Sequence, residues 1–147
     1  MITIKAAEIT KDVLEDNDFG MPIIIYTITP RIRRMLGQIK FKQLSVNVLL
    51  AKALLKIQPE ERPMQVEAIL NRLSDWAEPL IIMDFEMLFD PRYNIDVLRF
   101  LCEKARKTKV VAIWPGKLQE NKLSYVESTD PDYHEYDCST YQVCIVQ

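Results

Sequence analysis

Apolar residues along this chain form short runs that alternate with longer segments in which they recur every three or four positions. Three runs with almost no charged residue predict strands buried on both faces of a parallel sheet: 21–28, 79–84 and 110–114. An alternating pattern predicts another strand over 39–47. Weaker patterns predict strands over 123–126 and 141–146, on either side of an acidic loop over 127–137.

The segments between these strands have the apolar spacing and the boundary residues of helices. The first predicted helix covers 5–17 and ends at Asn17, Asp18 and Gly20; the second begins at Pro30 with Thr29 as its N-cap. Three further helices are predicted: one over 48–57, one that begins at Pro63 and one that begins at Asn94. Because strands and helices alternate, right-handed crossovers place helices on both faces of the sheet. We therefore predict one α/β domain, residues 1–147, with three αβα layers around a mostly parallel central sheet.

The composition is that of a globular domain, with 48% hydrophobic and 27% charged residues in 147. A chain of this length buries about 70% of its unfolded surface, which is enough for a sizeable core. No apolar run approaches the roughly 20 residues that a membrane-spanning helix needs, and the N-terminus lacks a signal-peptide pattern. We expect a cytoplasmic protein that does not contact a membrane.

Charge and cysteine content limit the partners and cofactors. The formal net charge is −2, so nucleic acid would bind only through a local basic patch. Cys102, Cys138 and Cys144 form no C-x-x-C pair, and the single histidine leaves a zinc site short of ligands. We expect reduced thiols and no bound metal.

The segment Leu80–Asp90, LIIMDFEMLFD, carries the most informative chemistry, because four apolar residues lead into the acids Asp84, Glu86 and Asp90. In a P-loop NTPase, a strand of this kind holds the acids that bind Mg²⁺ and activate water. The phosphate-binding loop that accompanies it, G-x-x-x-x-G-K-[ST], is absent from a sequence whose three glycines stand singly. The pattern predicts an NTPase-like domain that lacks the ATP-binding loop.

Three stretches in a consistent order carry a resemblance to a known family. They are SVNVLLAKALLKIQPEERPMQVEAIL (45–70), the segment that ends in Glu86-x-x-Phe89-Asp90-Pro91, and LSYVESTDPDYHEYD (123–137). Together they span most of residues 21–137, and they resemble the small P-loop protein of BREX-type phage-defence systems. The resemblance implies a P-loop NTPase-like core of the AAA or RecA type that acts within a multi-protein complex restricting phage DNA.

The chain departs from this family where the family binds nucleotide. The segment 25–31, IYTITPR, stands in place of the phosphate-binding loop. Met83 stands in place of the metal-linked acid, so Asp84 comes one position late and faces the other side of the strand. Trp114 and Pro115 stand where such ATPases carry a polar sensor. We therefore predict no cofactor; ATP with Mg²⁺ belongs to the alternative of an active enzyme.

A group of residues at a predicted helix start could bind an anion or a nucleotide. These are Thr29, Arg31, Arg33 and Arg34, because free amide hydrogens and basic side chains at a helix N-terminus attract phosphate. A solvated basic face, with the apolar residues of this helix packed inward, is the simpler interpretation.

The acids at the end of the third predicted strand could instead hold a divalent metal for phosphoester hydrolysis, since hard cations prefer carboxylate oxygens. This interpretation uses Asp84, Glu86 and Asp90. Acids at strand ends also commonly make local hydrogen bonds to the backbone, and we favour that role. Further along, Tyr125, Tyr133 and Tyr136 are candidates for a protein interface, where tyrosine is enriched.

The sequence thus predicts a degenerate P-loop NTPase-like subunit that assembles or regulates a phage-defence complex through protein partners and possible homo-oligomers. One alternative is an active enzyme, either an ATPase with an irregular phosphate loop or a metal-dependent phosphoester hydrolase. Another alternative is a DNA-binding accessory protein that uses the basic helix at Arg31, Arg33 and Arg34.

Overall fold

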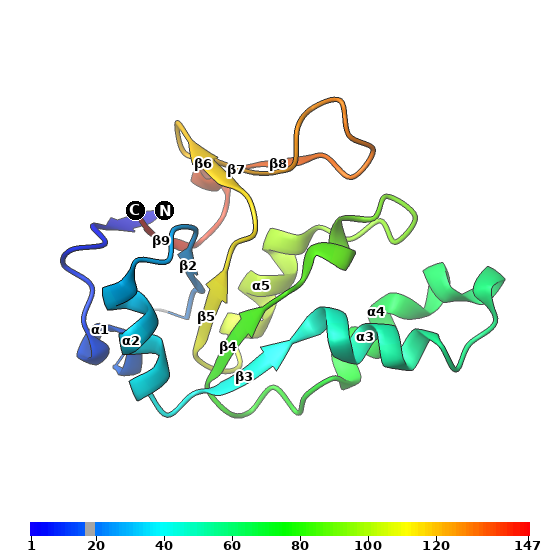
Figure 1. Cartoon of the computed structure of the whole chain (residues 1–147), viewed down its shortest axis with the longest axis horizontal. Coiled ribbons are helices and arrows are strands. Elements are labelled where there is room, and N and C mark those ends of the chain that lie inside the picture. The colour runs from blue at the N-terminus through cyan, green and yellow to red at the C-terminus, as the bar shows by residue number, and fades with distance from the viewer. Residues whose placement is uncertain (17–19) are drawn as a thin grey trace.

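The computed structural model describes residues 1–16 and 20–147 and contains a six-stranded parallel sheet (Figure 1). In spatial order the strands are β1 (Ile2–Ile4), β9 (Cys144–Val146), β2 (Ile23–Ile25), β5 (Val110–Ile113), β4 (Leu80–Met83) and β3 (Lys42–Ser45). Every neighbouring pair in this sheet is parallel. The parallel sheet expected from the apolar runs is confirmed.

Helices cover both faces of the sheet, as expected. The helices α1 (Lys11–Glu15) and α2 (Pro30–Gln38) pack on one face, where they form a buried cluster with Ile23 and Ile25 of β2. The other face carries the helices α3 (Val46–Leu54), α4 (Arg62–Arg72) and α5 (Val97–Ala105). Among the described residues there are also three short 3₁₀ helices: η1 (Pro59–Glu61), η2 (Glu86–Phe89) and η3 (Cys138–Thr140).

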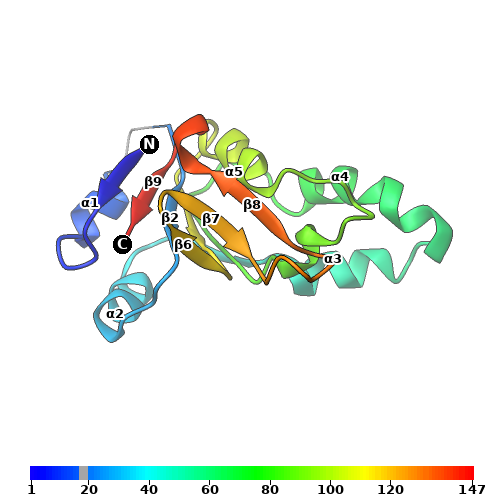
Figure 2. The same ribbon diagram turned by 90° about the horizontal axis from the view of Figure 1, so that it is seen from above.

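A small antiparallel sheet lies in the connection between β5 and β9. It consists of β6 (Lys117–Gln119), β7 (Lys122–Tyr125) and β8 (His134–Asp137), paired in that order. Figures 1 and 2 place it beyond the carboxyl ends of the central strands, so that it covers this end of the parallel sheet. Leu123 of β7 and Tyr136 of β8 are buried in the same cluster as α3, α4 and α5.

Several local predictions need correction. Of the helix predicted over 5–17, the described residues 5–16 form only the short helix α1, and the predicted end at Asn17 and Asp18 lies outside the described residues. The predicted acidic loop contains β8, and the cap of α5 is Asp96 instead of Asn94. The strands β1 and β6 were not predicted, because each has only three residues and neither carries a buried apolar pattern.

Candidate functional site

Parallel α/β sheets bind ligands beyond the carboxyl ends of their strands, at the point where connections from neighbouring strands leave toward opposite faces. Here that point lies between β2 and β5. The strand β2 leads into α2 on one face, whereas β5 leads into the antiparallel sheet, whose buried residues belong to the cluster on the other face. The predicted nucleotide residues all follow strands at this end of the sheet, so their arrangement decides whether a site exists.

The connection from β2 to α2 is short and leads directly into the helix. Thr29 caps α2 as predicted: its Oγ1 accepts a hydrogen bond from the Ile32 amide at 3.2 Å, and its carbonyl accepts the Arg33 amide at 2.9 Å. Pro30, the first residue of the helix, has no amide hydrogen. Only residues 26–29 separate the strand from the helix, and none of them is a glycine. This turn lacks the length and the free amides of a phosphate-binding loop.

The three predicted arginines do not converge on this turn. The Arg31 guanidinium donates hydrogen bonds to the carbonyl oxygen of Ala6, at 2.9 Å, and to that of Ile9. It therefore fastens α2 to the segment that precedes α1. Arg33 and Arg34 are exposed, and neither takes part in an ion pair in the described ranges 1–16 and 20–147. The structure thus separates Arg31, which has a structural role, from the other two.

The acids that follow β4 form hydrogen bonds with residues at the junction of β3 and α3. The Asp84 carboxylate accepts a hydrogen bond from Ser45 Oγ at 2.9 Å, and its carbonyl oxygen accepts the Asn47 amide at 2.6 Å. Asn47 also donates to the Glu86 carboxylate through Nδ2 and accepts the Met87 amide at 3.0 Å through Oδ1. These contacts tie the carboxyl ends of β3 and β4 together. The expected local bonds to the backbone are not the ones found, because both carboxylates bond to side chains that lie 39 positions away in the sequence.

Asp90 lies at the far end of η2 and belongs to a separate contact. Its carboxylate forms an ion pair with Arg92 at 2.6 Å, and the hydrogen bond from Arg92 lowers the pKa of Asp90. Among the residues that the structure describes, no three His, Cys, Asp or Glu side chains are grouped so that they could hold a metal ion. Asp84, Glu86 and Asp90 therefore have protein partners, and they do not form a metal-binding group.

Aromatic side chains fill the space beyond the carboxyl ends of β4 and β5. We call Phe85, Phe89, Trp114, Tyr125 and Tyr136 the aromatic cluster. The Phe89 ring stacks on Tyr125 with a centroid separation of 4.2 Å and meets Trp114 edge-on at 5.5 Å. Phe85 and Phe89 are fully buried and Trp114 is 2% exposed. Side chains of the protein thus occupy the end of the sheet at which parallel α/β folds commonly bind ligands.

Close backbone packing joins this cluster to the antiparallel sheet. Trp114 Nε1 donates a hydrogen bond to the Ser124 carbonyl oxygen at 2.9 Å. Gly116 allows this approach, because a Cβ atom at this position would lie 1.8 Å from the same oxygen. From the sequence, Trp114 was noted only because it stands where a polar sensor would be expected. The signal for this packing was the combination of an aromatic residue after β5 and a nearby glycine.

The three tyrosines predicted as interface residues have different environments. Tyr125 stacks on Phe89 and is partly buried. Tyr133 donates its hydroxyl hydrogen to Glu135 at 2.7 Å. Tyr136 is 7% exposed, its hydroxyl oxygen accepts the Val97 amide at the start of α5, and burial raises its pKa to about 12. The interface prediction is therefore corrected for Tyr136, which belongs to the core.

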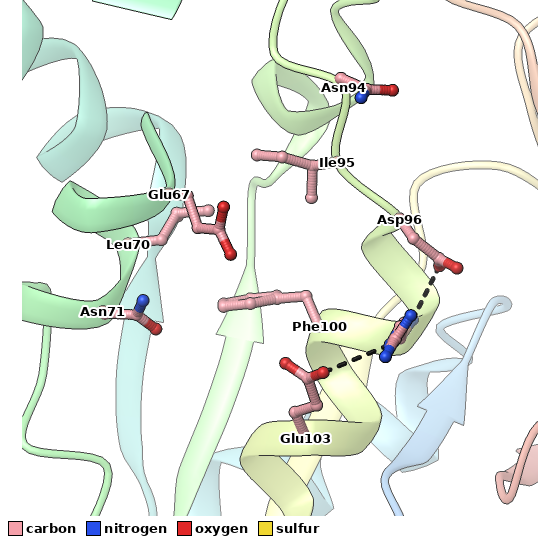
Figure 3. Close-up of a pocket in the computed structure, with 9 residues that line it drawn as sticks. Glu67, Leu70, Asn71, Asn94, Ile95, Asp96, Phe100 and Glu103 are labelled. Atoms are coloured by element: carbon pink, nitrogen blue, oxygen red, sulfur yellow. Dashed lines mark hydrogen bonds and ion pairs between the residues drawn. The ribbon is translucent and has the colours of Figure 1, made fainter. Parts of the chain in front are cut away.

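A separate polar cavity of about 360 Å³ lies between α4 and α5 (Figure 3). Figure 3 shows Glu67 and Glu103 on either side of the Phe100 ring. Arg99 forms an ion pair with Glu103 at 3.3 Å, and Asp96 accepts the Arg99 amide. No residue predicted as a site from the sequence lines this cavity.

None of the helices in the described parts of the chain has the length and hydrophobicity needed to cross a bilayer. Comparisons of the chain with models of known protein families, with curated proteins and with solved structures gave no match. The interpretation of the site therefore depends on its own geometry.

The different roles of the arginines can be tested by matched substitutions. We expect Arg31→Ala to lower the free energy of unfolding by about 1 kcal/mol, because two hydrogen bonds to backbone carbonyls are lost at an exposed position. Arg34→Ala, the control on the same helix, should change it by less than about 0.5 kcal/mol. Urea unfolding followed by circular dichroism measures both values, and equal effects would contradict the structural role of Arg31.

Proposed function

We propose that this protein is a P-loop NTPase-like subunit that does not hydrolyse nucleotide and that serves in the assembly or regulation of a phage-defence complex. The strand order supports an origin in the AAA or RecA type of NTPase. In that type one strand lies between the strand that precedes the phosphate loop and the strand that carries the metal-binding acid. Here β5 lies between β2, which precedes the IYTITPR segment, and β4, which leads into Asp84.

The observation that carries the non-catalytic part of the proposal is the closed carboxyl end of the sheet. A P-loop binds phosphate through several backbone amides, a lysine and a Mg²⁺ ion. In this protein the corresponding turn is the four-residue connection that Thr29 caps, and the acids Asp84 and Glu86 are bonded to Ser45 and Asn47. The adjoining space contains the aromatic cluster.

The lost contacts are sufficient to abolish useful affinity. A charge-assisted hydrogen bond contributes about 1.5–3 kcal/mol, and micromolar binding corresponds to about 8 kcal/mol in total. Removing three such contacts costs at least about 4.5 kcal/mol, which moves a micromolar site beyond millimolar.

The assembly part of the proposal is supported by the exposed surface of the α3–α4 hairpin, which projects from the sheet in Figure 1. Four of the large exposed apolar residues lie on it: Val48, Leu49, Leu55 and Met64. Leu55 and Met64 are 76% and 77% exposed. Beside them a groove of about 290 Å³ runs between the hairpin and η2, and its lining is mostly apolar. Apolar surface of this kind is typical of a contact with another protein.

Nucleotide binding is tested by isothermal titration calorimetry. We expect no heat of binding for ATP with Mg²⁺ at concentrations up to 1 mM, because the turn at Thr29 offers too few donors. A micromolar dissociation constant would overturn the non-catalytic assignment, and turnover that is lost in Glu86→Gln would favour an active enzyme.

Self-assembly is tested by size-exclusion chromatography with light scattering. We expect the wild type to have a mass above the 17.2 kDa of one chain, and Leu55→Asp to shift it toward the monomer. Val126→Asp is the matched control, because Val126 is another exposed apolar residue, 37% exposed, that lies outside the hairpin. A wild-type monomer, or equal effects of both substitutions, would contradict assembly through this surface.

A further inference from the structure

Charge is distributed very unevenly along the chain. Residues 19–59 contain seven of the 19 lysines and arginines and none of the 21 aspartates and glutamates. Within this segment α2, β3 and α3 follow one another along one side of the molecule (Figure 1). The strand β3 is the last strand of the sheet on this side. A protein whose net charge is −2 therefore has one edge without any acidic residue of its own.

The basic part of this edge is formed by α2 and β3. We call Arg33, Arg34, Lys40 and Lys42 the basic band; all four side chains are exposed. None of them takes part in an ion pair among the described residues, whose ion pairs all lie in the segment 90–135. The cations of the basic band are thus available to an external anion.

The packing of α2 places Arg31 and Arg33 on opposite flanks of the helix. Buried Ile32, Met35 and Leu36 fix the inward face of the helix, and Arg31 on one flank reaches the segment before α1. Successive helical residues are rotated by about 100°, so Arg33, two positions after Arg31, lies about 200° further round, on the opposite flank. That flank faces away from the segment before α1, to which Arg31 is bonded.

Arg33 and Arg34, unlike Arg31, are not explained by the requirements of the fold. Three arginines within the first five residues of α2, with no acid in its first turn, interact unfavourably with the positive end of the helix dipole. A lysine on an edge strand can prevent strand pairing with other chains, which accounts for Lys42. It does not account for Arg33 and Arg34, which lie on a helix.

We propose that the basic band binds the phosphate backbone of double-stranded nucleic acid. Apart from Pro30 and Gly37, the other exposed residues of α2 and β3 are Arg31, whose guanidinium is bonded to Ala6 and Ile9, and Gln38 and Gln43, whose amides are donors of the kind that contact phosphates. This surface has no exposed large apolar residue, which a protein interface would need at its centre.

Double-stranded nucleic acid fits this surface better than a single strand does. Binding of single strands relies on exposed aromatic side chains on which bases stack. The aromatic residues described in this segment are Tyr26 and Phe41, and each packs against a buried cluster. Contacts limited to phosphates predict binding without sequence preference and with a strong dependence on salt.

Fluorescence anisotropy with a labelled 20-base-pair DNA duplex tests the proposal. With about four phosphates neutralised, the plot of log K against log salt should have a slope of about −3 to −4, so affinity should fall about 100-fold between 50 and 200 mM salt. The double variant Arg33→Glu/Lys42→Glu should bind at least about tenfold more weakly at 50 mM salt. Glutamate near the start of α2 is favourable to the helix dipole, so this variant should fold, as circular dichroism would verify.

The matched control is Arg106→Glu/Lys107→Glu, which changes the net charge equally at exposed residues after α5. This control should reduce binding by less than about threefold, because long-range effects of net charge are screened by salt. Absence of binding to duplex DNA and duplex RNA at 50 mM salt would overturn the proposal, as would an equal loss in both variants. Tighter binding of single-stranded DNA or of poly-glutamate would overturn the assignment of the ligand.

Discussion

The carboxyl end of the central sheet depends on the burial of the aromatic cluster. Phe85 is the second residue after β4 and Trp114 is the first residue after β5, so both strands place a large ring at the same end of the sheet. Tyr125 and Tyr136 come from the antiparallel sheet and complete the cluster from above. Edge-on and stacked contacts of this kind contribute about 0.5–1.5 kcal/mol per pair beyond the burial of their area. The cluster thereby holds the antiparallel sheet over the end of the parallel one.

This packing changes the role that we assign to the acids in LIIMDFEMLFD. Rings of the aromatic cluster lie beyond the carboxyl ends of β4 and β5, and Asp84 and Glu86 accept hydrogen bonds from Ser45 and Asn47 at the junction of β3 and α3. They stabilise the junction from which the α3–α4 hairpin projects. With the ligand end of the sheet closed, two surfaces that are open to partners lie beside β3: the apolar hairpin and the basic band.

The sequence predicted the central strands and helices well, because their signals are local. The apolar runs at β2, β4 and β5 and the Thr29-Pro30 start of α2 depend on neighbouring residues only. The antiparallel sheet was missed in part, since β6 and β8 carry alternating polar residues whose pairing depends on β7. Two site features were equally hidden in the sequence. The burial of Tyr136 and the bonding of Arg31 to Ala6 both join residues that are more than twenty positions apart.

Nuclear magnetic resonance of the backbone over residues 26–34, with and without 5 mM ATP and Mg²⁺, tests most directly whether this end of the sheet is closed. The structure predicts helical chemical shifts that begin at Pro30, and no change in the amide resonances of Arg31 and Ile32 when nucleotide is added. An extended segment beyond Pro30 would contradict the closed arrangement, if its amide resonances shifted and the segment became ordered when nucleotide was added.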